Sequence, residues 1–291
     1  HSHQIYQNTI ADAVNMNYGI YNSADSSAFV ENTIDGGVQG IYFNSDARDN
    51  TISDNTIENS SSYAVYFDGS DYNTISNNTI TNSNGVYLKY NADYNNIISN
   101  TMTEIDNYGI NMQASGSSYP DNILVDNNNI TFSDENLSSR YGIYNTGYTS
   151  STDNIFSNNT ISMPDVNYNG YGIYAFRSLI ESNTINIENG YYQIRGIYGY
   201  DLEITNNTIS IDASYTSTNN SYISSSIYIA NGGSSDNIIT GNSITFTGGV
   251  SANGIYIYSE DATLNGNVIV GNGGYSIYSS SSVLYMYDNL L

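Results

Sequence analysis

The sequence predicts an all-β fold in which the chain winds as a parallel β-solenoid of about 11 to 12 coils. Two short runs recur along the whole length. One places an asparagine two residues before an apolar residue, and the other reads Gly-Ile-Tyr or a close variant. A third observation is that no segment carries a 3.6-residue apolar stripe long enough for a helix. Because a repeat from end to end indicates one repetitive unit, we expect a single domain over residues 1–291.

Each period contains three short β-like runs, as residues 73–96 illustrate. The runs are residues 73–75, 78–80 and 85–88, and Asn, Ser, Asp and Gly, which favour turns, lie between them. Such short runs in coils of mostly 22 to 25 residues lack the regular two-residue turns of hairpins. The chain is therefore expected to wind in one direction, so that equivalent strands of successive coils form three parallel sheets.

The asparagine that stands two residues before an apolar residue predicts an internal ladder of asparagine side chains. In a parallel stack, identical side chains lie above one another, and each amide can donate to one neighbour while it accepts from the other. Aspartate could not replace asparagine in such a column, because stacked carboxylates repel one another. The predicted ladder residues are Asn8, Asn32, Asn55, Asn78, Asn100, Asn128, Asn159, Asn183, Asn207, Asn242, Asn267 and Asn289.

The Gly-Ile-Tyr run predicts the third strand of each coil. Side chains alternate along a strand, so Ile or Val is expected inside the solenoid and Tyr outside it. Irregular insertions at about 131–141, 162–171 and 211–225 fall between the Asn run and this run, which places them at one edge. Insertions on one side of a repeat protein often form a binding face, although tolerant loops also drift in length.

Tyrosines on this face and in the insertions are the predicted ligand or partner surface. They are Tyr141, Tyr144, Tyr168, Tyr171, Tyr174, Tyr198, Tyr215, Tyr222 and Tyr228. Aromatic side chains with a hydroxyl at the rim suit sugar rings or protein partners. Two alternatives remain open at this point: tyrosine is a good strand residue whose stacking stabilises a sheet, and the rings could pack laterally within an assembly.

The composition excludes several classes of partner. The chain has 28 acidic and five basic residues, a formal charge of −23, and no cysteine. Nucleic acids and anionic membranes require basic patches, so neither is an expected partner. No run of 18 apolar residues predicts membrane insertion. Residues 1–4 are interpreted as a tag remnant or a mature N-terminus.

Acidic residues recur in the turn after the tyrosine run. Asp71, Asp93, Asp121 and Asp153 are weak candidates for structural Ca²⁺, which takes six to eight oxygen ligands. Aspartate is also a common turn residue, and no regular calcium-binding repeat is present. We therefore assign no cofactor and leave structural Ca²⁺ open.

The repeats resemble those of right-handed parallel β-helices of the pectin-lyase-like superfamily, in particular the NosD-like group of parallel β-helix repeats. The resemblance rests on Asn-Thr-Ile at residues 55–57 and 78–80 and Gly-Ile-Tyr at residues 40–42 and 172–174, and it covers residues 5–291. It implies a right-handed solenoid. The richness in Asn, Tyr, Ser and Asp, with few Lys or Arg, also resembles adhesin-like surface proteins of methanogenic archaea. That resemblance implies an extracellular, cell-surface location.

Catalytic motifs of the polysaccharide-degrading β-helices are not found. Both histidines lie in the first three residues, and nothing singles out one pair of acids for glycoside hydrolysis. We therefore expect a non-enzymatic structural or adhesive component of a cell surface. The alternative is a carbohydrate-binding or carbohydrate-processing β-helix that uses the tyrosine-rich face and the insertion loops.

The two ends of the repeat have two interpretations: the chain is a piece of a longer surface protein, or it assembles end to end with copies of itself. The Asn run begins at Asn8 and recurs until Asn289, and exposed strand edges invite pairing. The expected partners are therefore copies of the chain, end to end in a filament or sheath or side by side, or other surface proteins and glycans. The predicted end-to-end contact residues are Ile5, Ile10, Leu284, Leu290 and Leu291. Several Asn-x-Ser/Thr sequons, such as the one at Asn77, can carry N-glycans if the protein is exported.

Overall fold

The fold was analysed in a computed structural model that describes residues 3–13, 16–114, 116, 118–134, 138–147, 153–213, 223–233, 236–248, 252–258, 260–280 and 283–291. The described part of the chain forms strands and turns, and it contains no helix long and apolar enough to cross a membrane. Two compact units are present. The N-terminal unit comprises His1–Phe132 and Tyr144–Ile155, and the C-terminal unit comprises Ser133–Ile143 and Phe156–Leu291.

The N-terminal unit contributes strands to three parallel sheets, A, B and C, within which each strand pairs with the next one named. Its sheet A contains β1 (Gln4–Tyr6), β4 (Ala28–Val30), β7 (Thr51–Ser53), β10 (Thr74–Ser76), β13 (Asn96–Ile98) and β16 (Leu124–Asp126). Its sheet B contains β2 (Thr9–Ala13), β5 (Thr33–Gly36), β8 (Thr56–Glu58), β11 (Thr79–Thr81), β14 (Thr101–Ile105) and β17 (Asn129–Phe132). Its sheet C contains β3 (Tyr18–Asn22), β6 (Gln39–Phe43), β9 (Tyr63–Asp68), β12 (Asn84–Lys89) and β15 (Tyr108–Gln113).

The C-terminal unit repeats this arrangement. Its sheet A contains β22 (Ser178–Glu181), β25 (Glu203–Thr205), β28 (Asn237–Thr240), β31 (Ala262–Asn265) and β34 (Leu284–Tyr287). Its sheet B contains β20 (Thr160–Met163), β23 (Thr184–Ile187), β26 (Thr208–Ala213), β29 (Ser243–Gly248) and β32 (Val268–Asn272). Its sheet C contains β21 (Gly170–Phe176), β24 (Ile194–Tyr200), β27 (Ser224–Ile229), β30 (Ala252–Ile257) and β33 (Ile277–Ser279), while β18 (Arg140–Asn145) and β19 (Asn154–Ser157) include residues of both units.

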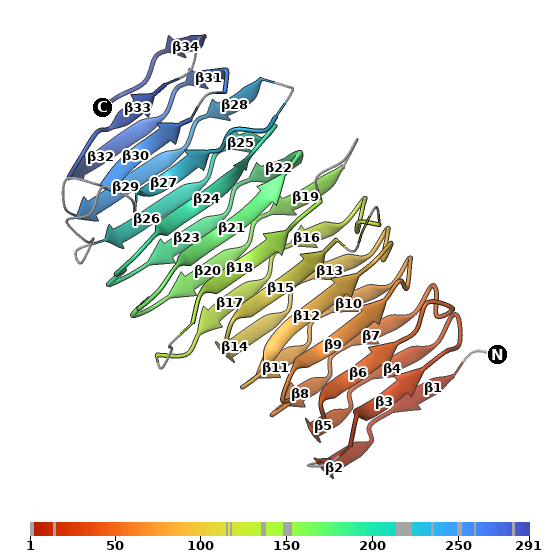
Figure 1. Cartoon of the computed structure of the whole chain (residues 1–291). Coiled ribbons are helices and arrows are strands. Elements are labelled where there is room, and N and C mark those ends of the chain that lie inside the picture. Colours follow the sequence, from red (N-terminus) through yellow and green to blue (C-terminus); the bar gives the residue numbers. More distant parts are fainter. Residues whose placement is uncertain are drawn as a thin grey trace. The chain divides into compact units, whose positions relative to one another are not determined.

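Within each unit, the strands of one sheet follow one another in sequence order, as the colours in Figure 1 show. The register keeps equivalent residues together. Ile57 of β8 pairs with Ile34 of β5 and Ile80 of β11, and all three side chains are fully buried. Columns of Ile, Val and Phe therefore fill the interior. The prediction of an all-β solenoid with three parallel sheets and about eleven turns is confirmed.

The asparagine ladder is present in both units. Asn55 Nδ2 donates to Asn78 Oδ1, and Asn78 Nδ2 donates to Asn100 Oδ1, at 2.9 and 3.0 Å. The same bond joins Asn183 to Asn207 at 3.0 Å in the C-terminal unit. The ladder carries more bonds than predicted, because each Oδ1 also accepts the backbone N–H of the preceding ladder residue, as in the 2.9 Å bond from Asn55 N to Asn78 Oδ1. The buried amides of Asn55 and Asn78 thereby donate hydrogen bonds through Nδ2 and accept them through Oδ1.

The residue before each ladder asparagine turns the chain from sheet A to sheet B. These residues have positive φ angles, for example 57° at Asp54, 56° at Asn77 and 56° at Ser182. Only Gly241 and Gly266 supply this left-handed conformation with a glycine. One left-handed residue therefore sets the corner in front of each rung of the ladder.

Small residues, mostly glycine, lie near the start of the sheet C strands for a different reason. A Cβ atom on Gly172 would collide with the side chain of Ile185 in sheet B and with the carbonyl oxygen of Gly196. The strand thus crosses directly over a core isoleucine. This explains the Gly-Ile-Tyr pattern and the small Ala64 and Ser226 that replace glycine in other coils.

Candidate functional site

A groove of about 530 Å³ lies in the C-terminal unit, where the chain passes from sheet B to sheet C. It is lined by Asp134, Asp165, Asn167, Asn189 and Tyr191. These residues belong to the insertions expected between the Asn run and the Gly-Ile-Tyr run or to the equivalent turn of the next coil. The predicted insertion edge therefore contains a hollow lined by carboxylates, amides and an aromatic ring.

Stacked turns bring the groove residues together. β20 and β23 pair in register up to Met163 and Ile187, and the backbone N–H of Glu188 donates to the carbonyl of Met163 at 2.9 Å. Two residues beyond each strand, Asp165 and Asn189 adopt positive φ angles of 46° and 51°. Asn189 Nδ2 donates to Asp165 Oδ1 at 2.6 Å, so the two side chains form one column along the groove.

Arg140 hydrogen-bonds to the backbone beside two of the groove residues. Its side chain is fully buried, with Nη1 donating to the carbonyl oxygen of Pro164 at 2.6 Å and Nη2 donating to that of Ser133. Each carbonyl belongs to the residue immediately before a groove aspartate, Asp165 or Asp134. One rigid guanidinium therefore holds two adjacent turns at a fixed separation and positions both carboxylates.

Tyrosine rings flank this polar surface. Tyr168 stacks on Tyr192 with ring centroids 5.6 Å apart and an interplanar angle of 22°, and Tyr191 contacts Tyr192 edge-on at 5.0 Å. Tyr168 and Tyr191 remain 44% and 45% exposed. Broad apolar ring surface thus lies beside acceptors and donors, which is the combination that orients a polar ligand with an apolar face.

The other predicted tyrosines form columns on the outer face of sheet C. In the C-terminal unit, the centroids of Tyr228 and Tyr256 are 4.9 Å apart and those of Tyr256 and Tyr278 are 4.6 Å apart, with nearly parallel planes. Tyr174, Tyr198 and Tyr228 continue this column at 4.6 and 5.4 Å, although their rings are tilted. Because neighbouring rings cover each other's faces, the column mainly stabilises the sheet.

The remaining tyrosines of the predicted surface differ in exposure. Tyr141 stacks on Tyr171 at 5.0 Å, and Tyr171 is only 6% exposed and donates its hydroxyl to Gln193 Oε1 at 3.2 Å. Tyr144 packs on Tyr108 at 5.5 Å in the N-terminal unit. Tyr215 and Tyr222 lie outside the described residues. Of the residues predicted to bind a ligand, Tyr168 is the one that the structure places beside the groove with an open ring.

The four aspartates considered for Ca²⁺ do form a column, in the N-terminal unit. Asp71 Oδ1 accepts the backbone N–H of Asp93 at 3.0 Å, and Asp93 Oδ1 accepts that of Asp121 at 2.9 Å. Asp121 Oδ1 accepts that of Asp153 at 3.2 Å. Desolvation raises the pKa of Asp93 to about 6, and the neighbouring carboxylates of Asp71 and Asp121 add to the effect. Among the described residues, no group of three or more acidic, His or Cys side chains is arranged to hold a metal ion.

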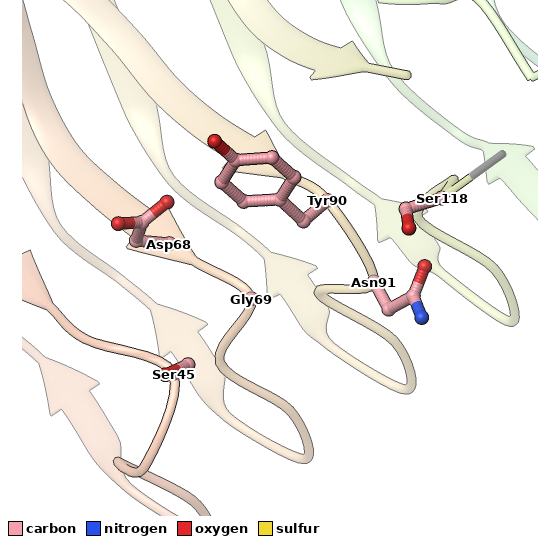
Figure 2. A pocket seen from close by; sticks show the side chains of 6 residues that line it. All are labelled: Ser45, Asp68, Gly69, Tyr90, Asn91 and Ser118. Carbon is pink, nitrogen blue, oxygen red and sulfur yellow. The ribbon is translucent and has the colours of Figure 1, made fainter. Parts of the chain in front are cut away.

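A second hollow, of about 320 Å³, lies in the N-terminal unit where the chain leaves sheet C (Figure 2). Its lining residues are Ser45, Asp68, Gly69, Tyr90, Asn91 and Ser118. Asp68 Oδ2 accepts the hydroxyl of Tyr42 at 2.7 Å, and Asp68 Oδ1 lies 3.9 Å from Lys89 Nζ, which in turn lies over the Tyr90 ring at 4.4 Å. Since its acid and its aromatic face already have partners, this hollow is the weaker candidate.

The predicted end residues lie in the first and last coils. Leu290 and Leu291 are 65% and 61% exposed, whereas Ile5, Ile10 and Leu284 are half-buried. The solenoid therefore presents apolar surface on its last coil.

Sequence reasoning did not find the polar residues of the groove, namely Arg140, Asp134, Asp165, Asn167 and Asn189. Two of these residues, Asp165 and Asn189, could have been found from the spacing of the sequence. Pro-Asp at 164–165 and Glu-Asn at 188–189 stand at the same distance beyond their strands, which would have aligned the aspartate with the asparagine. Arg140 carried no such signal, because its partners are backbone carbonyls.

Comparison with known proteins identifies the fold. A family model described as "Right handed beta helix region" matches residues 1–161. A tailspike protein mutant of E. coli bacteriophage HK620 in complex with a pentasaccharide has a TM-score of 0.55 at 13% identity, covering 94% of this chain and 55% of that one. A comparison with curated protein sequences finds no match.

Two further solved structures share the fold. The catalytic domain of a GH87 α-1,3-glucanase in complex with tetrasaccharides has a TM-score of 0.53 at 16% identity, covering 93% of this chain and 56% of that one. The Dettilon tailspike protein has a TM-score of 0.51 at 18% identity, covering 98% of this chain and 61% of that one. The chain thus spans from 55% to 61% of the length of these structures. Its structural neighbours are β-helices that include glycan complexes and a glycoside hydrolase domain.

Proposed function

Because this chain belongs to the right-handed β-helix family, we propose that it is a carbohydrate-binding β-solenoid whose ligand lies in the groove between sheets B and C of the C-terminal unit. One observation carries the proposal. The exposed rings of Tyr168 and Tyr191 lie beside a column of carboxylate and amide groups in a hollow of about 530 Å³. That volume lies within the range of about 300–1,000 Å³ typical of small-ligand sites.

The groove chemistry matches a sugar in two respects. A pyranose has an apolar C–H face that packs on an aromatic ring, and hydroxyl groups that donate and accept hydrogen bonds. The carboxylate oxygens of Asp134 and Asp165 are hydrogen-bond acceptors, whereas the side-chain amides of Asn167 and Asn189 can both donate and accept. The formal charge of −23 further favours uncharged sugars over polyuronates in this groove.

The solved structures support the proposal only as examples of what the fold can present. The HK620 tailspike structure holds a pentasaccharide, and the GH87 glucanase structure holds tetrasaccharides. A carbohydrate-processing variant of the function would use the Asp134–Asp165 pair. These aspartates come from adjacent turns, which are separated by about 4.8 Å in a parallel stack, and retaining glycosidases use carboxyl groups about 5–5.5 Å apart.

Binding is testable by tyrosine fluorescence, because the chain has no tryptophan. We expect neutral oligosaccharides from a panel of α- and β-linked glucans and galactans to bind, and Tyr191→Ala to weaken binding about tenfold, the loss expected for about 1.4 kcal/mol of ring contact. Tyr72→Ala is the matched control, because Tyr72 is equally exposed at 49% but stacks on Tyr94 in the N-terminal unit. Equal affinities of the two variants would contradict the placement of the ligand.

Product analysis separates binding from processing. A carbohydrate-binding protein leaves the oligosaccharide intact during prolonged incubation. Release of shorter sugars by the wild-type chain, abolished by Asp165→Asn, would replace the binding function with a hydrolytic one.

A second candidate function, a structural or adhesive component of a cell surface, is favoured by the ends of the ladder. Asn289 accepts two bonds from Asn267, but no described group accepts the backbone N–H of Asn289. Asn8 donates to Asn32, and no described group donates to Asn8 Oδ1. Further coils, whether of the same polypeptide or of another copy, would therefore extend the ladder at either end, and glycan binding is compatible with such a role.

A further inference from the structure

Arg195 is a buried cation on the outer face of sheet C. It lies in β24 of the C-terminal unit and is 8% exposed. Its guanidinium carbon is 4.0 Å from the ring centroid of Tyr228, 4.5 Å from that of Tyr198 and 5.6 Å from that of Tyr171. Three aromatic rings therefore surround the charge and attract it through their π-systems.

Arg195 differs from the other four Lys and Arg residues, because three of them have carboxylate partners and the buried Arg140 donates to two backbone carbonyls. Arg48 pairs with Asp71, Lys89 lies near Asp68, and Arg177 pairs with Asp201. Among the described residues, no carboxylate contacts Arg195, although the chain carries 28 acids. A buried charge is normally paired and hydrogen-bonded, so an unpaired guanidinium in such an acidic protein indicates a place kept for an external anion.

Two polar atoms at this position also lack a hydrogen-bond partner. Arg195 Nε is buried without a hydrogen-bond acceptor, and so is the hydroxyl oxygen of Ser225, the residue paired with Arg195 in β27. Tyr171, the partner of Arg195 in β21, bonds to Gln193 instead. The outer face thus holds one N–H group and one hydroxyl group, in adjacent strands, that are buried and have no described hydrogen-bond partner.

We propose that Arg195 and the surrounding tyrosines form a subsite for the carboxylate group of an acidic sugar. The planar guanidinium matches a carboxylate in both geometry and charge. A single cation surrounded by net negative charge holds one carboxylate but not a polyanion, so the ligand class is a mostly neutral oligosaccharide with one acidic residue.

This inference rests on the proposed function and extends it. Tyr191, which lines the groove, and Arg195 are four residues apart on one chain segment, a span of at most about 13 Å at 3.3 Å per extended residue. The neutral part of an oligosaccharide in the groove and a carboxylate at Arg195 are therefore within reach of the same ligand.

The first test uses acetate as the probe and observes the arginine Nε–H resonances by NMR. The chain has four arginines, so four signals are expected, and the one lost in Arg195→Lys belongs to Arg195. Acetate should shift this signal saturably while the signals of Arg48 and Arg177 stay in place. An unmoved Arg195 signal, or equal drift of all four signals, would overturn the subsite.

The second test compares sialyllactose, which carries one carboxylate, with lactose and with trigalacturonate. The wild-type chain should bind sialyllactose at least tenfold more tightly than lactose and should bind trigalacturonate more weakly than sialyllactose. Arg195→Gln should abolish the preference for sialyllactose and leave lactose affinity unchanged. The matched control Arg48→Gln removes the same charge from the exposed Arg48 of the N-terminal unit and should retain the preference.

The outcomes of the two tests distinguish the subsite from the groove. Lactose binding without a preference for sialyllactose overturns the subsite alone, whereas an acetate shift without binding of any saccharide overturns the groove function and shows that Arg195 is an anion site that takes no sugar. If Arg195→Gln does not fold, Arg195→Lys and the salt dependence of wild-type binding replace it. The preference for sialyllactose should then fall at least threefold in the lysine variant and decrease between 0.05 and 0.5 M salt, while lactose affinity stays constant. A preference that survives both changes contradicts the assignment.

Discussion

At the scale of single residues, the ladder asparagines matter through the number of bonds that each one makes. Asn78 Nδ2 donates to the carbonyls of Ile52 and Ser76 and to Asn100 Oδ1, and Asn78 Oδ1 accepts both N–H groups of Asn55. Replacing one asparagine thus leaves buried groups unsatisfied in three coils. The ladder residue is a connector between coils, not a local capping group.

Asn78→Ala should therefore lower the free energy of unfolding by about 3 kcal/mol, since each buried polar group that loses its partner costs about 1–3 kcal/mol. Chemical denaturation of the two proteins measures the difference. The control is Asn91→Ala, at an exposed position without a positive φ angle, and its effect should stay within about 0.5 kcal/mol. Similar losses for both variants would show that burial in the ladder is not the cause.

At the scale of secondary-structure elements, columns of side chains run across equivalent turns. Whether the side chains of a column are neutral or charged determines the free-energy cost of stacking them. The asparagine column is neutral and both donates and accepts. The aspartate column of Asp71, Asp93, Asp121 and Asp153 accepts backbone N–H groups in a similar way but places charges in successive coils. A charge in the middle of such a column is desolvated and repelled from both sides.

This arrangement predicts a pH dependence. The folded-state pKa of Asp93, about 6, lies above the ordinary value of 3.8 for an aspartate, so folding favours the protonated form. The contribution to stability is complete below about pH 4 and is lost as pH rises through about 6. Because the side chain is about half-buried, solvent screening weakens the effect of the pKa shift on stability. We expect the free energy of unfolding to fall by about 1 kcal/mol between pH 4 and pH 7.

Asp93→Asn isolates this contribution. The amide oxygen can still accept the N–H of Asp121 but carries no charge, so the variant should be about 1 kcal/mol more stable than wild type at pH 7 and equally stable at pH 4. Thermal or chemical unfolding at both pH values provides the measurement. Asp46→Asn, at an exposed turn position, should leave the pH profile unchanged. A constant difference between Asp93→Asn and wild type at both pH values would contradict the account.

The same elements show how much could be predicted from the sequence. The strands, the ladder and the inward isoleucines were predictable, because equivalent residues of every coil must meet in a parallel stack. The groove was only half predictable. Its edge follows from the insertions, but the directions of Asp134 and Asp165 depend on Arg140 reaching the carbonyls of Ser133 and Pro164, a non-periodic contact.

At the scale of the whole molecule, the net charge and the apolar surface of the last coil have opposite effects on association between copies of the chain. The formal charge of −23 keeps copies apart, whereas the proposed end-to-end association would bury the exposed Leu290 and Leu291. Such a head-to-tail contact is heterologous, so it does not close on itself unless a rotation happens to complete a ring. The balance between the two effects depends on ionic strength.

Association of the 291-residue chain should therefore increase with salt, in contrast to an interface held by ion pairs. We expect light scattering at fixed protein concentration to show a larger mean mass in 0.5 M than in 0.02 M NaCl. Leu290→Asp should suppress the increase, and Tyr72→Asp, a new charge away from the last coil, should not. A constant mass from low to high protein concentration in high salt would exclude end-to-end assembly.

The ladder also has a consequence for how such proteins diversify. Asn207 and Asn242 are 35 residues apart and Asn78 and Asn100 are 22 apart, yet both pairs share the same 3.0 Å bond. The length of the intervening loop therefore leaves the rung unchanged. Insertions can be exchanged or lengthened without a compensating change in the core, so recognition at the insertion edge can evolve separately from the stability of the scaffold.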